Sequence, residues 1–393
     1  MTQIDNIRTY AYRTRTMIRP RKHPSIEQAW GIAIDVGYSA VKIFAPNIYA
    51  CFPSYARKID KKTEFLGEAD HDCILYENEE GERWIVGAYA QSMIEKNEAS
   101  SSLSGLVVRD RFYSPMFKVI ARTGIALGMT ANRFGSPQGK VLTVQTGLPP
   151  RHMGEYKQDL STVLSGEHRF RIKIGSAEWQ DVNITLPEDN IYVMPQPLGS
   201  FVAVSTDSNG GIVPEGREYI LSTALVCDPG YGTADTFNIT GRRITGNATW
   251  EDLGMYRVLS DTCSDIYDLY RTEITVPAMQ KYLESGCIRV TDRRARTTKE
   301  VSFSDILVKN SEKVCDELLR TMDEAYDGLF NHDYLIVTGG LGAAWYDRIK
   351  EYYSGVETLK VIPGTQNDTI EGIFSNVRGY YMNLLSTMKK KYK

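Results

Sequence analysis

Short apolar runs and longer segments with helical spacing alternate along most of the chain. Apolar runs that end at turn residues predict strands at residues 32–34, 41–44, 141–148, 192–194 and 334–337. Strict alternation of apolar and polar residues predicts a further hairpin, formed by residues 168–175 and 179–186.

Apolar residues at helical spacing predict helices at residues 154–165, 303–330 and 369–388. Two more helices are expected to open near Pro197 and at Gly342. Because strands alternate with helices, the sheets should be covered by helices, and the predicted fold class is α/β.

One segment occurs twice. Residues 32–44 read IAIDVGYSAVKIF and residues 225–237 read LVCDPGYGTADTF, so that Asp35 matches Asp228 at a distance of 193 residues. Both copies are expected to form a strand, a tight turn and a return strand. The repeat therefore predicts two related lobes that face each other across a cleft.

The repeated turn has the composition of a phosphate-binding loop. Gly37 and Gly230 allow a tight turn whose backbone N–H groups can approach an anion. An aspartate beside phosphates is repulsive unless a cation lies between them, so Asp35 and Asp228 together imply Mg²⁺ held mainly through its waters. Lys42, seven residues after Asp35, can neutralise phosphate charge, and Asp235 takes the equivalent place in the second copy.

A third Gly-rich turn, Thr338-Gly339-Gly340-Leu341-Gly342, follows the predicted strand 334–337. Its small residues would let a flat base or a ribose lie against the backbone. No G-x-x-x-x-G-K-[S/T] sequence occurs, so the chain is not a P-loop protein.

Composition narrows the class of protein. The 393 residues are 42% hydrophobic and 24% charged, which is ordinary for a soluble globular protein, and no apolar run is long enough for a membrane-spanning helix. Basic residues near the start are not followed by an apolar segment, which argues against a secretory signal peptide. The six cysteines are scattered without a C-x-x-C pair, so we expect reduced thiols in a cytoplasmic protein.

Charge is concentrated at the two ends. Residues 1–22 contain six basic residues and one acidic residue, and residues 388–393 contain four basic residues. The remainder has 36 basic against 48 acidic residues. The basic N-terminal arm is expected either to be solvated or to dock on an acidic surface, with a neighbouring subunit preferred over DNA.

Four motifs occur in an order that resembles the actin superfamily, which includes actins, heat-shock chaperone ATPase domains and sugar kinases. They are DVGYSAVK, VMPQPLGSFVA, DPGYGTAD and VTGGLGAAW, and the resemblance spans roughly residues 30–385. VMPQPLGSFVA, GLPP and the late NVRGYY resemble the bacterial ParM/StbA group of plasmid-partition filament proteins. The sequence departs from relatives in its long arm and in Pro229 and Tyr231 of the second loop.

The resemblance assigns roles to individual residues. Asp35 and Asp228 resemble the aspartates that order the waters of Mg²⁺, and Gln196 falls at the position that orients the attacking water. These three residues are the expected catalytic set. The expected nucleotide contacts are Gly37, Tyr38, Ser39, Lys42, Gly230, Tyr231, Gly232, Thr233, Asp235, Gly339, Gly340 and Leu341.

The resemblance also implies an architecture: an actin-like fold with two lobes, four subdomains and a nucleotide cleft. The expected boundaries are an arm at 1–28, lobe I at 29–195 plus 365–393, and lobe II at 196–364. Outer subdomains are expected at about 46–110 and about 242–302.

The function implied is a bacterial actin homologue that forms filaments, hydrolyses ATP or GTP after polymerisation and drives plasmid segregation. Its partners would be further copies of itself and a DNA-bound adaptor at a plasmid centromere, with no membrane and no sequence-specific nucleic-acid binding. The alternatives are a small-molecule kinase or a cell-shape protein of the same superfamily. A kinase needs a carboxylate base beside its acceptor hydroxyl, whereas Gln196 suits water. A chaperone ATPase would need a substrate-binding domain after NVRGYY.

Overall fold

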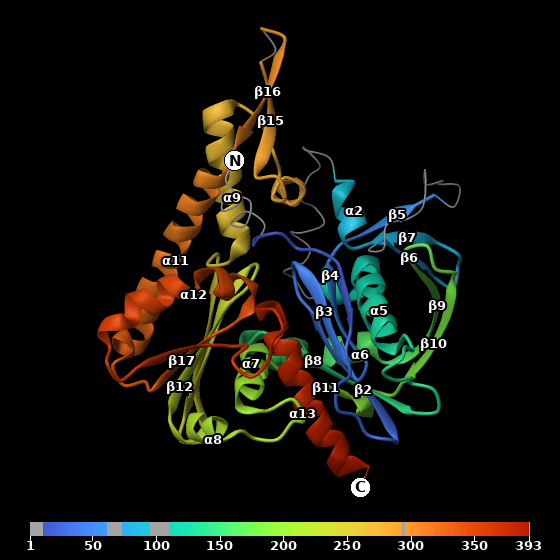
Figure 1. Cartoon of the computed structure of the whole chain (residues 1–393). Helices are drawn as coiled ribbons and strands as arrows, with labels where there is room; N and C mark the ends of the chain where they lie inside the picture. Colours follow the sequence, from blue (N-terminus) through green and yellow to red (C-terminus); the bar gives the residue numbers. More distant parts are fainter. Residues whose placement is uncertain (1–10, 61–72, 95–109, 293–294, 393) are drawn as a thin grey trace.

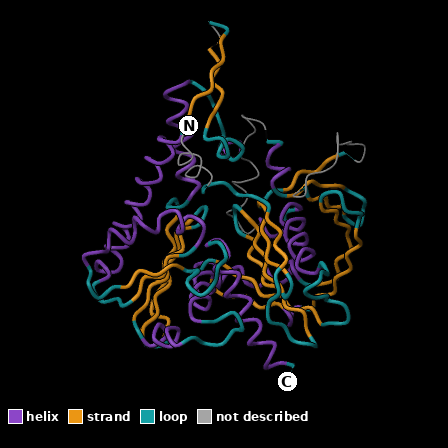
Figure 2. Tube along the Cα trace, viewed as in Figure 1, coloured by secondary structure: helices purple, strands orange, loops and turns teal. Residues whose placement is uncertain are grey.

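Two lobes lie side by side in the computed structural model, which describes residues 11–60, 73–94, 110–292 and 295–392 (Figure 1). Each lobe is built on one mixed sheet flanked by helices (Figure 2). No helix in these described ranges is long and apolar enough to span a membrane.

The inner sheet of lobe I has six strands in the order β1-β4-β3-β2-β8-β11. Its central strand β2 is buried along its whole length, as expected for a strand covered on both faces. Strands β2, β3 and β4 form an antiparallel meander, and β2, β8 and β11 are parallel. The strands are β1 (Met17–Pro20), β2 (Ala29–Val36), β3 (Ala40–Ala45), β4 (Ile48–Pro53), β8 (Val141–Leu148) and β11 (Ile191–Pro195).

The inner sheet of lobe II repeats this arrangement in the order β14-β13-β12-β17-β18. Again three strands form an antiparallel meander, and the first of them is parallel to two later strands. The strands are β12 (Thr223–Pro229), β13 (Thr233–Thr240), β14 (Arg243–Glu251), β17 (Tyr334–Val337) and β18 (Lys360–Pro363). The two lobes that the sequence repeat predicts therefore share one topology.

Each lobe carries an additional β-structure. In lobe I, a five-stranded antiparallel sheet has the order β10-β9-β6-β7-β5. Its strands are β5 (Ala56–Ile59), β6 (Ile74–Glu77), β7 (Arg83–Val86), β9 (Gly166–Ile174) and β10 (Gln180–Leu186). In lobe II, the hairpin of β15 (Cys287–Asp292) and β16 (Thr297–Ser302) projects at the top of Figure 1. The hairpin predicted at 168–186 is confirmed as β9–β10.

Helices cover both faces of each inner sheet. In β2, Ile32 and Ile34 belong to the same apolar cluster as residues of α5, whereas Ala33 on the opposite face clusters with residues of α13. In lobe II, Val226 lies in one cluster with residues of α7 and α8, and its neighbour Cys227 lies in the cluster that contains α11. The helices are α2 (Ala88–Ser92), α4 (Asp110–Tyr113), α5 (Pro115–Met129), α6 (Met153–Leu164), α7 (Gln196–Ser205), α8 (Pro214–Leu221), α9 (Met255–Tyr270), α10 (Val276–Met279), α11 (Ser304–Tyr326), α12 (Gly339–Tyr352) and α13 (Ser375–Lys391).

The lobes meet where α7 crosses α13, near the centre of Figure 1. The helices touch through backbone at two glycines, because a Cβ on Gly379 would lie 1.7 Å from the Gly199 carbonyl oxygen. Tyr380 also fills the space beside Gly199, where a Cβ would come within 2.5 Å of its ring. This crossing is the principal helical contact between the lobes.

The N-terminal arm is docked on its own chain where the structure describes it. Strand β1 pairs antiparallel with β4 from Met17↔Cys51 to Pro20↔Ile48, so it extends the inner sheet of lobe I by one strand. His23 stacks on Phe44 with ring centroids 4.0 Å apart. We call residues 11–24 the strap. The first ten residues lie outside the described ranges.

Two helix starts differ from the sequence prediction. Helix α12 begins at Gly339 rather than Gly342, so the Gly-rich turn forms its first turn. Helix α13 begins at Ser375 rather than at residue 369. There the carboxylate of Asp368 accepts hydrogen bonds from the Thr369 backbone and from Arg378, which holds the chain in a loop before the helix.

Candidate functional site

The two matched turns have the same backbone geometry. In the first, the Gly37 N–H donates to the Ala40 carbonyl at 3.2 Å, and in the second the Gly230 N–H donates to the Thr233 carbonyl at 2.8 Å. Each turn follows the central strand of its inner sheet. The sequence repeat is therefore a repeat of one local structure.

Register places equivalent side chains opposite one another in the two hairpins. Asp35 on β2 pairs with Lys42 on β3, and Asp228 on β12 pairs with Asp235 on β13. The first pair is an ion pair, with the Lys42 ammonium 2.9 Å from Asp35 Oδ2. The second pair consists of two carboxylates, so lobe II contributes negative charge where lobe I contributes a balanced pair.

Both turns line one cavity of about 400 Å³ between the lobes. The third Gly-rich turn lines it as well. Of the predicted site residues, the cavity is lined by Asp35, Gly37, Tyr38, Ser39, Lys42, Gln196, Asp228, Gly230, Tyr231, Thr233, Asp235, Gly339, Gly340 and Leu341. Gly232 is not part of the lining, although a Cβ there would lie 4.0 Å from the Tyr38 ring of the opposite loop.

Asp35 organises the first loop. Its Oδ1 accepts a hydrogen bond from the Gln196 side-chain amide at 3.2 Å, and its Oδ2 accepts from Lys42. Gln196 is the first residue of α7, directly after β11, so the strand end fixes its position. Burial alone would lower the pKa of Lys42, but the charges of Asp35 and Asp228 and the hydrogen bond to Asp35 raise it above its ordinary value. Lys42 is therefore a fixed positive charge in the cavity.

Arg111 also holds the first loop in place. This residue of α4 is buried, and its guanidinium donates to the carbonyl oxygens of Val36 and Gly37, both at 2.8 Å. The guanidinium also lies 4.4 Å from the centroid of the Tyr38 ring. Burial lowers the pKa of Arg111, although Tyr38 and Asp35 act in the opposite direction. Arg111 thus fixes two carbonyls of the turn, while the Gly37 N–H is held by the Ala40 carbonyl.

The second loop contains two buried carboxylates. Burial raises the pKa of Asp228 to about 6, although a hydrogen bond from the Asn376 amide at 2.5 Å and the Lys42 charge act in the opposite direction. Burial also raises the pKa of Asp235 to about 7, despite a hydrogen bond from the Thr249 hydroxyl at 2.6 Å. Burial thus disfavours the ionised form of both carboxylates, and a cation bound in the cavity would stabilise that form.

The third turn closes on the second loop. Gly339 has φ +78°, and a Cβ on it would lie 2.4 Å from Asp228 Oδ1, so only glycine fits there. Asn376 Oδ1 accepts a hydrogen bond at 2.7 Å from the Ser200 hydroxyl, which also contacts the Thr338 hydroxyl at 2.5 Å. Residues of α7, α12 and α13 therefore share one buried hydrogen-bond network next to Asp228.

The donor set fits Mg²⁺ bound mainly through water. Asp35 and Asp228 line one cavity, and the negative charge of each raises the pKa of Lys42. Among the described residues no group of three or more His, Cys, Asp or Glu side chains could hold a metal ion. A bound Mg²⁺ would therefore take most of its ligands from water and a phosphate.

Some residues of this site were not identified from the sequence. Arg111, Asn376 and strap residues such as Tyr12 line the same cavity. Asn376 lies within the NVRGYY motif, so its position was marked but not its role. Arg111 and Tyr12 carry no motif, and their places depend on the tertiary fold.

Comparisons with known proteins agree with this geometry. The family model described as "Actin like proteins N terminal domain" matches residues 33–199. A comparison with curated proteins found no significant match.

Solved structures of ParM proteins are similar over nearly the whole chain. A non-polymerisable quadruple mutant of pCBH ParM has a TM-score of 0.68 and 20% identity, and covers 92% of this chain and 100% of its own. A 15-stranded ParM filament from Clostridium botulinum has a TM-score of 0.69 and 18% identity, with the same coverage of 92% and 100%. The archaeal actin homolog Ta0583 in complex with ADP has a TM-score of 0.60 and 16% identity, and covers 91% of this chain and 99% of its own. The predicted actin-like fold is confirmed: this chain has an actin-like fold similar to that of ParM proteins, and its residues 33–199 match the model of the N-terminal domain of actin-like proteins.

Proposed function

We propose that this chain binds ATP or GTP with Mg²⁺ in the cavity between its lobes, polymerises, and hydrolyses the nucleotide after assembly. The observation that carries the proposal is the pair of matched turns. Each brings a tight glycine turn and a buried aspartate to one cavity. The structural similarity to Ta0583 in complex with ADP supports a nucleotide as the ligand.

The residues have separate roles in this proposal. Asp35 and Asp228 order the waters of Mg²⁺, which when bound would neutralise charge on the phosphates. Gln196 orients the attacking water rather than removing its proton. The phosphates are held by Gly37, Tyr38, Ser39, Lys42, Gly230, Tyr231, Gly232 and Thr233. Asp235 faces the phosphates across the bound cation and its waters, and the nucleoside is held by Gly339, Gly340 and Leu341. Gly232 would contribute through its backbone.

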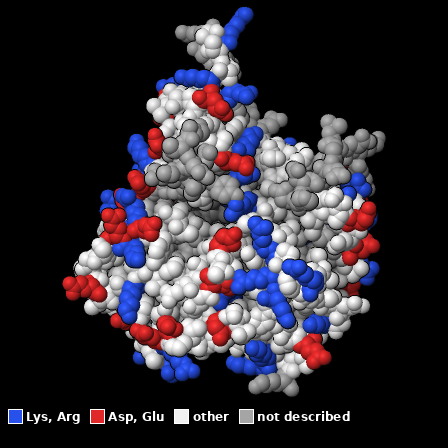
Figure 3. All heavy atoms as spheres, in the orientation of Figure 1, with Lys and Arg blue, Asp and Glu red and all other residues white. Residues whose placement is uncertain are grey.

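Filament formation is proposed from the relatives. A 15-stranded ParM filament and the Alp12 filament share this fold over most of the chain. By the same reasoning the filament acts in the cytoplasm on plasmid DNA, through a DNA-bound adaptor. The basic side chains near the centre of the face in Figure 3 are interspersed with acidic ones. Such a mixed surface suits contacts between subunits better than direct binding to DNA.

Electron microscopy of the purified chain with Mg-ATP and with Mg-GTP tests the proposal, together with phosphate release at increasing protein concentration. We expect filaments with at least one nucleotide, and turnover per molecule that rises above a threshold concentration without any added acceptor. Turnover that is independent of protein concentration and requires an acceptor hydroxyl would instead support a small-molecule kinase.

A further inference from the structure

The strap is attached to lobe I and to the crossing of α7 and α13. Four residues of β1 pair with β4 in lobe I. Closer to the crossing, the Arg21 guanidinium lies 2.8 Å from Asp368, a buried carboxylate in the loop before α13. The Tyr381 hydroxyl of α13 donates to the Pro24 carbonyl. Residues 17–24 are therefore fixed along their length.

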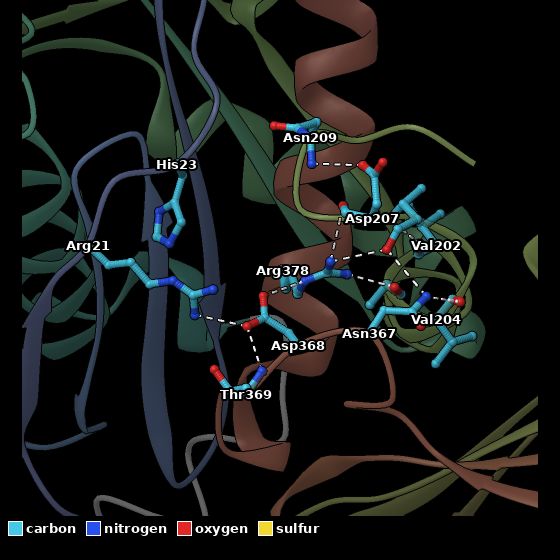
Figure 4. A network of polar contacts seen from close by, with 12 residues as sticks. Arg21, His23, Val202, Val204, Asp207, Asn209, Asn367, Asp368, Thr369 and Arg378 are labelled. Atoms are coloured by element: carbon cyan, nitrogen blue, oxygen red, sulfur yellow. Dashed lines mark hydrogen bonds and ion pairs between the residues drawn. The ribbon is translucent and has the colours of Figure 1, made fainter. Parts of the chain in front are cut away.

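Asp368 connects the strap to α7. Figure 4 shows Asp368 between Arg21 and Arg378. The second carboxylate oxygen of Asp368 accepts a hydrogen bond from Arg378 Nε at 2.9 Å, and the Arg378 side chain is only 2% exposed. Arg378 also donates to the carbonyls of Ala203 at 2.6 Å and Thr206 at 3.1 Å, at the C-terminal end of α7. One network thus joins the strap, α13 and the last turn of α7.

The other end of the strap is seated in lobe II. Tyr12 is 7% exposed and belongs to the apolar cluster of lobe II. Its hydroxyl contacts the Ser311 hydroxyl of α11, which also accepts a hydrogen bond from the Trp345 indole at 2.9 Å. The Thr14 N–H donates to the side-chain oxygen of Gln280 at 3.1 Å.

Between these attachments the strap forms one wall of the cavity. Ala11, Tyr12, Arg13, Thr14, Arg15 and Met17 line it. Other walls of the same cavity carry the two aspartate turns of the proposed nucleotide site. We propose that the strap closes this site: it spans both lobes along one side of the cavity, and its Tyr12 end must leave lobe II before a bound nucleotide can be released. This inference rests on the proposed function.

Tyr12 is the contact that should control release. Arg13 pairs with Glu284 at 2.8 Å, but the Glu284 side chain is 64% exposed, and such pairs contribute little in water. Tyr12, in contrast, buries its aromatic ring in lobe II. Its hydroxyl also hydrogen-bonds the Ser311 hydroxyl, which the Trp345 indole contacts as well. A separate hydrogen bond between the lobes, from Lys281 to the Ile94 carbonyl at 2.8 Å, does not involve Tyr12, so losing Tyr12 opens the strap without removing every link between the lobes.

The test measures release of N-methylanthraniloyl-ADP or -GDP with Mg²⁺ from the full chain, after a chase with unlabelled nucleotide. We expect Tyr12→Ala to release the probe at least about tenfold faster than wild type, equivalent to about 1.4 kcal/mol. Tyr12→Phe retains the ring and should give an intermediate rate. Tyr219→Ala is the matched control, because Tyr219 is a 3% exposed tyrosine of lobe II outside the cavity lining. It should lower the melting temperature without accelerating release.

Hydrogen exchange of the nucleotide-free chain provides a second measurement. In Tyr12→Ala the Thr14 amide should exchange faster, while the amides of β1 stay protected by β4. If wild type binds the probe and Tyr12→Ala releases it at the wild-type rate or more slowly, the strap does not close the site. If wild type binds neither probe, the proposed function itself is wrong.

Discussion

At the scale of single residues, the site depends on a few side chains held by buried partners. Gln196 illustrates this, since its amide is both at a helix start and bonded to Asp35. A neutral amide in that place can position a water but cannot accept its proton as a carboxylate would. Its contribution should therefore appear in turnover rather than in binding.

We predict that Gln196→Ala still binds nucleotide but hydrolyses it more slowly, by on the order of 10²–10³, as for other single positioning groups. Phosphate release and nucleotide titration on the same preparation measure the two effects. Gln180→Ala, an exposed glutamine on β10, serves as the control and should match wild type. Wild-type hydrolysis by Gln196→Ala would show that another group positions the water.

At the scale of elements, the α7–α13 crossing is the tightest contact between the lobes. We predict that Gly379→Ala destabilises the fold, because its Cβ would lie 1.7 Å from the Gly199 oxygen and must push two helices apart. Overpacking of this kind costs about 1–3 kcal/mol or more. Denaturant unfolding measures it. Gly154→Ala in α6 has nothing within 4 Å of its added Cβ and should leave stability equal or slightly higher.

The strap adds an acid-sensitive contact. His23 donates from Nδ1 to the Ala45 carbonyl at 2.6 Å, and burial lowers its pKa from 6.5 to about 4. As the pH falls, His23 is therefore protonated in the unfolded chain before it is protonated in the folded chain. The folded state has its full stability above pH 6.5 and loses stability progressively toward pH 4. At about 1.4 kcal/mol per pKa unit, this amounts to about 3 kcal/mol.

We predict that His23→Phe loses correspondingly less stability than wild type between pH 7 and pH 4, measured by urea unfolding at each pH. Phenylalanine keeps the stacking on Phe44 but cannot be protonated. Parallel pH profiles for the two proteins would mean that His23 is not held neutral by the fold.

The elements themselves were largely predictable. The turns of the repeat were found because two similar residue patterns, each with Asp-x-Gly-Tyr, recur at equivalent strand ends, so local sequence determines local structure there. The start of α13 was not, because the loop before it is held by Arg21, which is 347 residues away from Asp368. Asn376 and Arg111 were missed for the same reason: their partners lie on other elements.

At the scale of the whole molecule, the cavity is shared by both lobes, so its ligand should stabilise the entire fold. We predict that Mg²⁺ with ATP or GTP raises the unfolding free energy, by about 2.7 kcal/mol at a ligand concentration 100 times the Kd. Thermal unfolding with and without a chelator measures how much of this stabilisation depends on the metal. Asp228→Ala should lose most of that metal-dependent part, and an undiminished chelator effect in the variant would contradict the assignment of Asp228.

The strap also constrains the order in which the chain can fold. Tyr12 is synthesised well before its hydroxyl partner Ser311, which follows 299 positions later, and Trp345 comes later still. At about 5–20 residues per second, a ribosome needs roughly 15–60 seconds to cover the 299 residues from Tyr12 to Ser311. Strand β1 can pair with β4 early, whereas Tyr12 has no binding partner until lobe II has been synthesised. The Tyr12 end of the strap is thus synthesised long before the residues that bind it, and a nascent chain necessarily passes through a period with its cavity unclosed on that side.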